Sequence, residues 1–147
     1  MSVEVRALAR EDFAAWWPLF SGYCEFYRVT PDESRAQAVF ERFFDDEPPL
    51  YCLVAVADGE LIGFTHFKRY FESLSAAYEV NLDDLFVAPS ARGRGVGRAL
   101  IEAVCQAASN RQATLVRWIT AADNLAAQRL YDQLAKRTSW VTYEIEL

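Results

Sequence analysis

Apolar residues recur along the first part of the chain in patterns that predict a strand followed by two helices. Alternation over residues 3–6 predicts a short strand. Aromatic and aliphatic residues then recur at helical spacing over residues 10–27, which predicts an amphipathic helix with an unusually aromatic face. Residues 30–33, Thr-Pro-Asp-Glu, have the pattern of a capping box with proline at the first helical position, so a second helix is expected there.

The rest of the chain carries strand patterns interrupted by two further helical patterns. Residues 51–57 and 61–71 are predicted strands joined by Asp58-Gly59, a strong hairpin signal. A third strand is predicted over residues 77–87. The remaining expected elements are a helix over residues 96–110, a strand over 113–119, a helix over 124–136 and a last strand over 140–145.

This order, β-α-α-β-β-β-α-β-α-β, predicts an α/β fold with a mixed, mostly antiparallel central sheet flanked by helices. The helix over residues 96–110 is long enough to cross over and place the next strand parallel to its neighbour. With 147 residues and 52% hydrophobic content, the chain is expected to form a single domain over residues 1–147.

A glycine-rich stretch at residues 92–97, Arg-Gly-Arg-Gly-Val-Gly, joins the predicted strand 77–87 to the next helix. The first N–H groups of a helix lack partners within it, and the helix dipole adds positive charge at the same end. Glycine lets the backbone approach a ligand closely, and arginine contributes charge. The stretch is therefore expected to bind phosphate groups. It matches neither G-x-G-x-x-G nor a P-loop.

Two adjacent carboxylates, Asp83 and Asp84, interrupt the apolar strand before this stretch. Alternation sends neighbouring side chains to opposite faces, so at least one points into a covered region unless a bulge intervenes. A buried carboxylate is costly unless it is hydrogen-bonded, paired or functional. Amine acylation supplies a function, because a protonated amine must lose a proton before it attacks. The alternative is that one aspartate bonds backbone amides and the other is solvated.

Composition and charge exclude several classes of function. The net charge of −6 and the pI near 4.8 disfavour binding to nucleic acid or to an anionic membrane. Cys24, Cys52 and Cys105 match no disulfide or metal framework, and with His66 as the only histidine no metal site is expected. Reduced thiols, with no signal-peptide or membrane-span pattern, predict a cytoplasmic protein.

The pattern Arg92-x-x-Gly95-x-Gly97, placed between a strand and a helix, resembles the acetyl-coenzyme A loop of the GCN5-related N-acetyltransferases. Asn124 and Tyr131 lie seven residues apart and share a helix face, which is similar to that family's Asn-x-x-Ala-x-x-Leu/Phe-Tyr segment. The element order is also that of the family, so the resemblance spans nearly the whole chain. It implies the acyl-CoA N-acyltransferase fold and acetyl-CoA as cosubstrate.

The resemblance implies which residues bind the cofactor. The backbone of Phe86 and Val87 would pair with the pantetheine arm like an added strand, and Asn124 would contact the same arm. The residues expected at the pyrophosphate are Arg92, Gly93, Arg94, Gly95, Val96, Gly97 and Arg98.

The resemblance also implies the chemistry. The motif Leu-Asp-Asp-Leu-Phe-Val at residues 82–87 resembles the corresponding motif of the polyamine and thialysine acetyltransferases. This resemblance makes Asp83 the expected base and Asp84 the expected amine contact. Tyr27, at the end of the first helix, is a further amine contact through its ring. Tyr131 is expected to protonate the departing thiolate.

The sequence therefore predicts an N-acetyltransferase that moves an acetyl group directly to a primary amine of a small cationic molecule. No cysteine lies in the acidic strand or the loop, so a covalent relay is disfavoured. Two alternatives stay open, namely a protein or peptide amine acetyltransferase and a non-catalytic acyl-CoA-binding module. Trp16 is expected in the core, and His66 is given no part in the mechanism.

The chain departs from the family pattern after Tyr131, where the usual Gly-Phe is missing. The entry of the last strand is therefore left open. Some relatives pair or exchange this strand between subunits, so a homodimer is expected.

Overall fold

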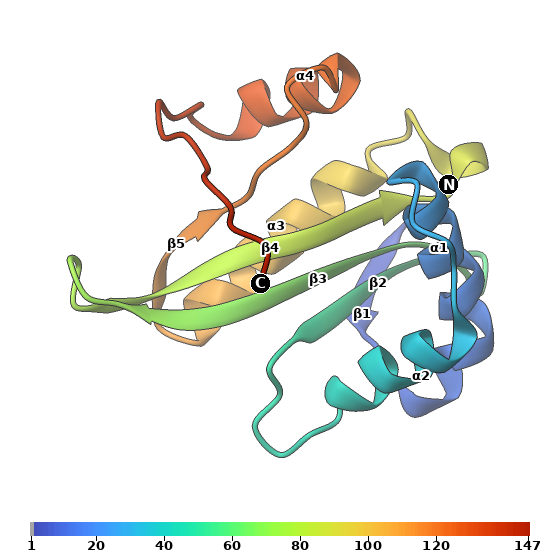
Figure 1. The fold of residues 1–147 in the computed structure, drawn as a ribbon. Helices are drawn as coiled ribbons and strands as arrows, with labels where there is room; N and C mark the ends of the chain where they lie inside the picture. Colours follow the sequence, from blue (N-terminus) through green and yellow to red (C-terminus); the bar gives the residue numbers. More distant parts are fainter. Residues whose placement is uncertain (1) are drawn as a thin grey trace.

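The structure is a computed structural model that describes residues 2–147, in which one twisted sheet carries helices on both faces (Figure 1). The strands lie in chain order across the sheet; β1 to β4 are antiparallel neighbours, and β5 is parallel to β4. The predicted mixed, mostly antiparallel fold is confirmed. The strands are β1 Glu4–Ala7, β2 Tyr51–Ala57, β3 Glu60–Glu72, β4 Ala77–Val87 and β5 Ala113–Arg117.

Four α-helices form close to where the apolar spacing predicts them. One detail of the prediction is wrong: α2 is capped by Asp32, not by a box that starts at Thr30. The Asp32 carboxylate accepts the N–H groups of Ser34 and Arg35 at 2.9 and 3.2 Å, so the helix begins at Glu33, two residues later than predicted. The helices are α1 Phe13–Phe26, α2 Glu33–Arg42, α3 Val96–Asn110 and α4 Leu125–Leu134.

Two apolar layers hold the helices to the sheet. The aromatic face of α1 packs with α2 on one side, where Trp16 and Phe64 are fully buried. On the other side α3 presents Val104 to Val80. Burying each such side chain contributes about 1.5–3 kcal/mol, so packing rather than helix propensity decides where α1 and α3 lie.

The β3–β4 hairpin contains a bulge that was not predictable from alternation alone. Pairing is regular from the turn to Phe67 opposite Leu82, but the next pair is His66 opposite Asp84. Asp83 is therefore an extra residue in β4. The bulge shifts the face that later residues present: Leu82 belongs to the α3 layer, whereas Asp84 bonds His66 and Tyr23 on the α1 side.

Strands β4 and β5 separate towards the glycine-rich stretch. Their pairing ends at Asn81 opposite Arg117, while β4 continues to Val87. The predicted strand 113–119 is correspondingly two residues shorter in the structure. Residues 82–87 of β4 thus have one edge that no strand pairs with, as the divergence of the two strands in Figure 1 illustrates.

The predicted last strand over residues 140–145 is wrong for the isolated chain, and the helix predicted to residue 136 ends at Leu134. Beyond that helix, residues 135–147 contain neither helix nor strand. Trp140, Tyr143 and Ile145 are 82%, 90% and 88% exposed. Alternation gives a segment two faces, but a strand also needs a neighbouring backbone, and none pairs with this segment inside the chain.

Candidate active site

The open edge of β4 borders a cavity of about 820 Å³, a size typical of small-molecule sites. Its walls come from the end of α1, the acidic part of β4, the glycine-rich stretch and α4. All predicted site residues except Arg94 and Asp84 lie in these walls. Those residues are Tyr27, Asp83, Phe86, Val87, Arg92, Gly93, Gly95, Val96, Gly97, Arg98, Asn124 and Tyr131.

The glycine-rich stretch takes positive φ angles where it lines the cavity. Gly93 and Gly95 have φ angles of 76° and 80°, which a residue with a Cβ adopts only with strain. Gly95 is the N-cap of α3, so no side chain caps the helix. The first bond of the helix runs from the Ala99 N–H to the Gly95 carbonyl at 3.0 Å, which leaves the preceding N–H groups for an anion.

Side chains tie this stretch to β4 and to α4. The Arg92 Nε donates to the Val87 carbonyl at 3.0 Å, and its guanidinium lies 5.4 Å from the centre of the Phe86 ring. The Arg98 Nη2 donates to the Gln133 Oε1 at 2.5 Å. These contacts fix the walls of the cavity relative to one another.

Glycine at residue 97 eases the fit between α3 and α4. A Cβ on Gly97 would lie 3.3 Å from the Leu130 Cδ2, so the two helices meet closely at this point. Arg94, by contrast, is exposed and lies outside the walls.

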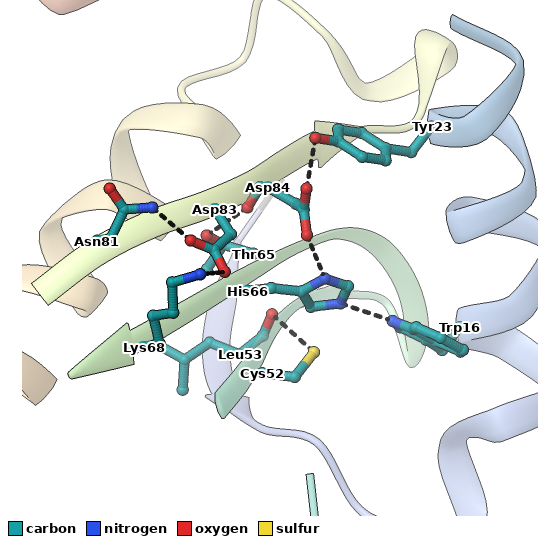
Figure 2. A network of polar contacts seen from close by, with 10 residues as sticks. All are labelled: Trp16, Tyr23, Cys52, Leu53, Thr65, His66, Lys68, Asn81, Asp83 and Asp84. Atoms are coloured by element: carbon teal, nitrogen blue, oxygen red, sulfur yellow. Dashed lines mark hydrogen bonds and ion pairs between the residues drawn. The ribbon is translucent and has the colours of Figure 1, made fainter. Parts of the chain in front are cut away.

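Asp84 belongs to a chain of polar contacts behind the cavity wall (Figure 2). Its Oδ1 accepts the Tyr23 hydroxyl at 2.6 Å, and its Oδ2 lies 2.8 Å from the His66 Nδ1. The His66 Nε2 in turn lies 3.3 Å from the Trp16 Nε1. An indole N–H only donates, so His66 accepts at Nε2 and donates from Nδ1 to Asp84.

The pKa of the Asp84 carboxyl lies below its ordinary value. Burial raises this pKa, but the His66 N–H, the Tyr23 hydroxyl and the charge of Lys68 outweigh burial. Burial, reinforced by the Asp84 charge, raises the pKa of Tyr23 far above its ordinary value. Asp84 is therefore a carboxylate and Tyr23 a neutral phenol at neutral pH.

Sequence reasoning assigned no function to His66, which is only 1% exposed and completes this network. The β3–β4 turn was the one available signal. If residues of the two strands are paired one by one away from that turn, His66 falls beside the acidic pair. Regular pairing, however, would place His66 opposite Asp83. The bulge moves the pairing to Asp84.

Asp83 has different surroundings, although it is the next residue. Its carboxylate accepts the Asn81 side-chain N–H and lies 3.3 Å from the Lys68 Nζ. Its side chain is 18% exposed and lines the cavity. Both aspartates thus bond side chains (Figure 2). Of the two, Asp83 is the one that lines the cavity.

Tyr131 and Asn124 share the face of α4 that borders the cavity, as their spacing predicts. Asn124 caps the helix, with its Oδ1 accepting the Ala127 N–H at 3.3 Å. The centres of the Tyr131 and Trp118 rings lie 5.4 Å apart in an edge-to-face arrangement. Burial, and to a smaller extent the nearby Tyr27, raises the pKa of the Tyr131 phenol. Tyr131 is therefore a neutral phenol at neutral pH. Trp118, which sequence reasoning missed, reaches the wall because β5 has left the sheet there.

Two other kinds of site were sought within residues 2–147. No group of three or more histidine, cysteine, aspartate or glutamate side chains is placed to hold a metal ion. In the same residues, no helix has the length and apolar character needed to cross a bilayer.

Comparison with known proteins identifies the class to which this fold and cavity belong. Residues 13–135 match the family model described as Acetyltransferase (GNAT) family. The chain belongs to this family and is an acetyl-CoA-dependent N-acetyltransferase. The acyl-CoA N-acyltransferase fold predicted from the loop and the Asn/Tyr pair is thereby confirmed.

Several N-acetyltransferases are similar to this chain along most of their length. A D-amino-acid N-acetyltransferase of Saccharomyces cerevisiae is 33% identical over 144 residues, which cover 97% of this chain and 89% of the relative. An uncharacterized N-acetyltransferase of Bacillus subtilis is 35% identical over 131 residues, covering 89% and 87%. The ribosomal-protein-alanine N-acetyltransferase structure from Brucella melitensis biovar Abortus 2308 superimposes with a TM-score of 0.85, at 24% identity and complete coverage of both chains.

Proposed function

We propose that residues 1–147 act as one N-acetyltransferase domain that moves the acetyl group of acetyl-CoA directly to a primary amine of a small cationic molecule. One observation carries this proposal: a single cavity joins a glycine-rich helix start, an unpaired strand edge, a half-buried tyrosine and an acidic bulge. A phosphate-bearing thioester and a positively charged amine can therefore meet inside one cavity.

The loop side of the cavity would hold the cofactor. The N–H groups at the start of α3, with the positive charges of Arg92 and Arg98, suit the pyrophosphate. The free edge at Phe86 and Val87 suits the amide-rich pantetheine arm as an added strand, because β5 has withdrawn. Asn124 lies on the opposite wall and would contact the same arm.

The acidic side would hold and activate the amine. Asp83 lines the cavity and would take the proton from the ammonium, directly or through water. Asp84 would add negative charge behind Tyr23, and the half-exposed Tyr27 ring would face the cation. The neutral Tyr131 phenol would then protonate the leaving thiolate. No cysteine lines the cavity, which supports direct transfer.

A second acceptor class has specific support. A relative that is 33% identical over nearly the whole chain is named a D-amino-acid N-acetyltransferase, so an amino-acid amine is the main alternative to a diamine. A non-catalytic acyl-CoA module is less well supported, because Tyr131 faces the cavity and the aspartates bond side chains.

The test is a panel of amines assayed for coenzyme A release from acetyl-CoA. The panel contains diamines, D- and L-amino acids, a lysine-containing peptide and a buffer-only blank. We expect the diamines to give the highest kcat/KM. Coenzyme A release with amino acids alone would mean that the substrate is an amino acid and not a small cationic amine. Release with the peptide alone would favour a protein or peptide substrate. No release with any amine would contradict the assigned transfer.

We also propose a cytoplasmic homodimer in which each chain lends residues 140–147 to its partner. The outer edge of β5 has no neighbour, and beside it lies a groove of about 570 Å³ lined in part by Leu115, Trp118 and Leu134. The exposed alternating segment supplies the missing strand. The three cysteines are free, which supports a reducing compartment.

Light scattering after size exclusion tests the dimer. We expect a mass twice the 16.7 kDa of the chain, and half that mass when residues 140–147 are deleted. A full-length protein that runs as a monomer at micromolar concentration would contradict strand exchange. A deletion variant that keeps the dimer mass would place the interface elsewhere.

A further inference from the structure

Tyr23 presents only one kind of hydrogen-bonding group to the cavity. Its hydroxyl has a single hydrogen, and that hydrogen is donated to the Asp84 Oδ1 at 2.6 Å. The ring of Tyr23 lines the cavity and lies 4.9 Å from the ring of Tyr27. The oxygen can therefore only accept a hydrogen bond from a molecule that enters.

The residues behind Tyr23 keep its hydroxyl hydrogen bonded to Asp84, so that the oxygen stays an acceptor. Asp84 must remain an acceptor for Tyr23, and it does so because the His66 Nδ1–H bonds its other oxygen. His66 must carry its hydrogen on Nδ1, and it does so because the Trp16 N–H occupies Nε2 at 3.3 Å. Both ring nitrogens are thus committed, and the chain orients hydrogens without passing a proton onward.

We propose that the Tyr23 hydroxyl oxygen accepts a hydrogen bond from an N–H of the substrate amine. Trp16 and His66 are positioning residues that keep the Tyr23 hydrogen on Asp84 and so leave the oxygen as an acceptor. The inference rests on the proposed function, because it describes how that same cavity recognises its amine. The carboxylate behind the phenol makes its oxygen a stronger acceptor.

This arrangement predicts a selectivity that aromatic contacts alone do not give. Rings such as Tyr27 attract any cation, including quaternary ammonium groups. An oxygen that accepts an N–H rewards only amines that carry one, so a trimethylated analogue with the same charge loses the contact. Primary amines should therefore bind better than their quaternary counterparts.

The experiment is calorimetric titration of the coenzyme A-loaded protein with butane-1,4-diamine and with its N,N,N,N′,N′,N′-hexamethyl derivative, which keeps both charges but carries no N–H. We expect the diamine to bind about tenfold to a hundredfold more tightly, because hydrogen bonds to charged groups carry free energies of that order. Tyr23→Phe should reduce this preference to about twofold or less, since the ring and its packing remain.

Tyr70→Phe is the matched control. Its hydroxyl also bonds a buried carboxylate, Glu79 at 3.1 Å, but it lies on the β3–β4 hairpin outside the cavity. It should keep the full preference. Thermal unfolding of each variant checks that the fold is retained, and Asp84→Asn provides a second variant, expected to weaken the preference, if Tyr23→Phe does not fold.

The possible results separate the two proposals. Coenzyme A-loaded protein that binds neither amine would overturn the diamine acceptor and this inference with it. Wild type and Tyr23→Phe with the same preference would overturn the role of Tyr23 alone.

The positioning role is read from the single histidine by ¹⁵N NMR. Wild type should show the Nδ1–H tautomer, which the Asp84 carboxylate also favours, and Trp16→Phe should shift the Nε2 resonance and reduce the preference for the primary amine. An unchanged preference in Trp16→Phe would remove Trp16 from the proposal.

Discussion

The two halves of the cavity are built by different means. The half proposed to hold the cofactor, here called the cofactor half, depends on backbone: Gly93 and Gly95 at positive φ, amides at the start of α3, and the unpaired edge of β4. The half proposed to hold the amine, here called the amine half, depends on side chains, in which Asp84 is held by Tyr23 and His66. A phosphate is recognised by converging N–H groups, whereas a single amine needs a charge and a directed acceptor.

This difference implies that the halves respond to different kinds of mutation. Adding a side chain damages the cofactor half, because its working groups are amides that need space. Removing a single polar atom damages the amine half, because each buried group there has a specific partner.

Gly95→Glu should have the largest effect. The substitution forces a Cβ into a φ of 80° and places a carboxylate at the proposed pyrophosphate site. We expect coenzyme A affinity, measured by calorimetry, to fall by about a hundredfold or more, since like charges in contact cost several kcal/mol. Gly59→Glu is the control, because Gly59 has φ 78° and equally open space but lies in the β2–β3 turn. Retained affinity in Gly95→Glu would contradict the anion site.

Tyr131→Phe should reduce turnover while the cofactor still binds. Loss of a general acid slows a reaction by about 10²-fold or more, and the ring contact with Trp118 persists. The readout is kcat from coenzyme A release, with coenzyme A affinity measured in parallel. Tyr78→Phe, on the exposed hairpin, should behave as wild type. Normal kcat in Tyr131→Phe would remove this residue as the acid.

Asp84→Asn should destabilise the fold by about 1–3 kcal/mol at pH 7, because it leaves the buried His66 N–H with a poorer partner. The pKa of Asp84 lies below its unfolded value, so its stabilisation is present above about pH 4 and is lost as the pH falls through the folded pKa. Urea unfolding at pH 7 and pH 3 measures both states. A deficit as large at pH 3 as at pH 7 would contradict the charge-based account.

Lys68→Met should have the smallest effect. Lys68 is half exposed and pairs with Asp83 at 3.3 Å, and such pairs contribute about 0–1 kcal/mol. We expect the difference in urea unfolding to shrink further in 0.5 M salt, about the range where exposed charges are screened. A loss of several kcal/mol would show that Asp83 is held as firmly as Asp84, and the contrast between the two would fail.

The helices, the sheet class and the glycine-rich stretch could be predicted because each depends on local pattern. Helix α3 and strand β4 begin and end where spacing and glycine place them. The shared face of Asn124 and Tyr131 follows from helix geometry alone. Family resemblance then led to the cofactor.

The amine half was less predictable, because it depends on one inserted residue. The bulge at Asp83 decides which face Asp84 presents, and alternation cannot locate a bulge. The contact between Trp16 and His66 joins residues fifty positions apart in the chain. A lone histidine on a predicted strand gives no sign of such a partner.

The sequence by itself determined every element except the last predicted strand, together with the glycine-rich loop at a helix start and the residues that could do chemistry, since these follow from periodicity, glycine and side-chain type. Only the tertiary structure decided that β5 leaves β4 beyond Asn81, that Asp84 turns towards Tyr23, and that residues 140–147 have no partner within the chain. Each of these depends on pairing between distant backbones, and a local pattern can specify a strand but not its neighbour.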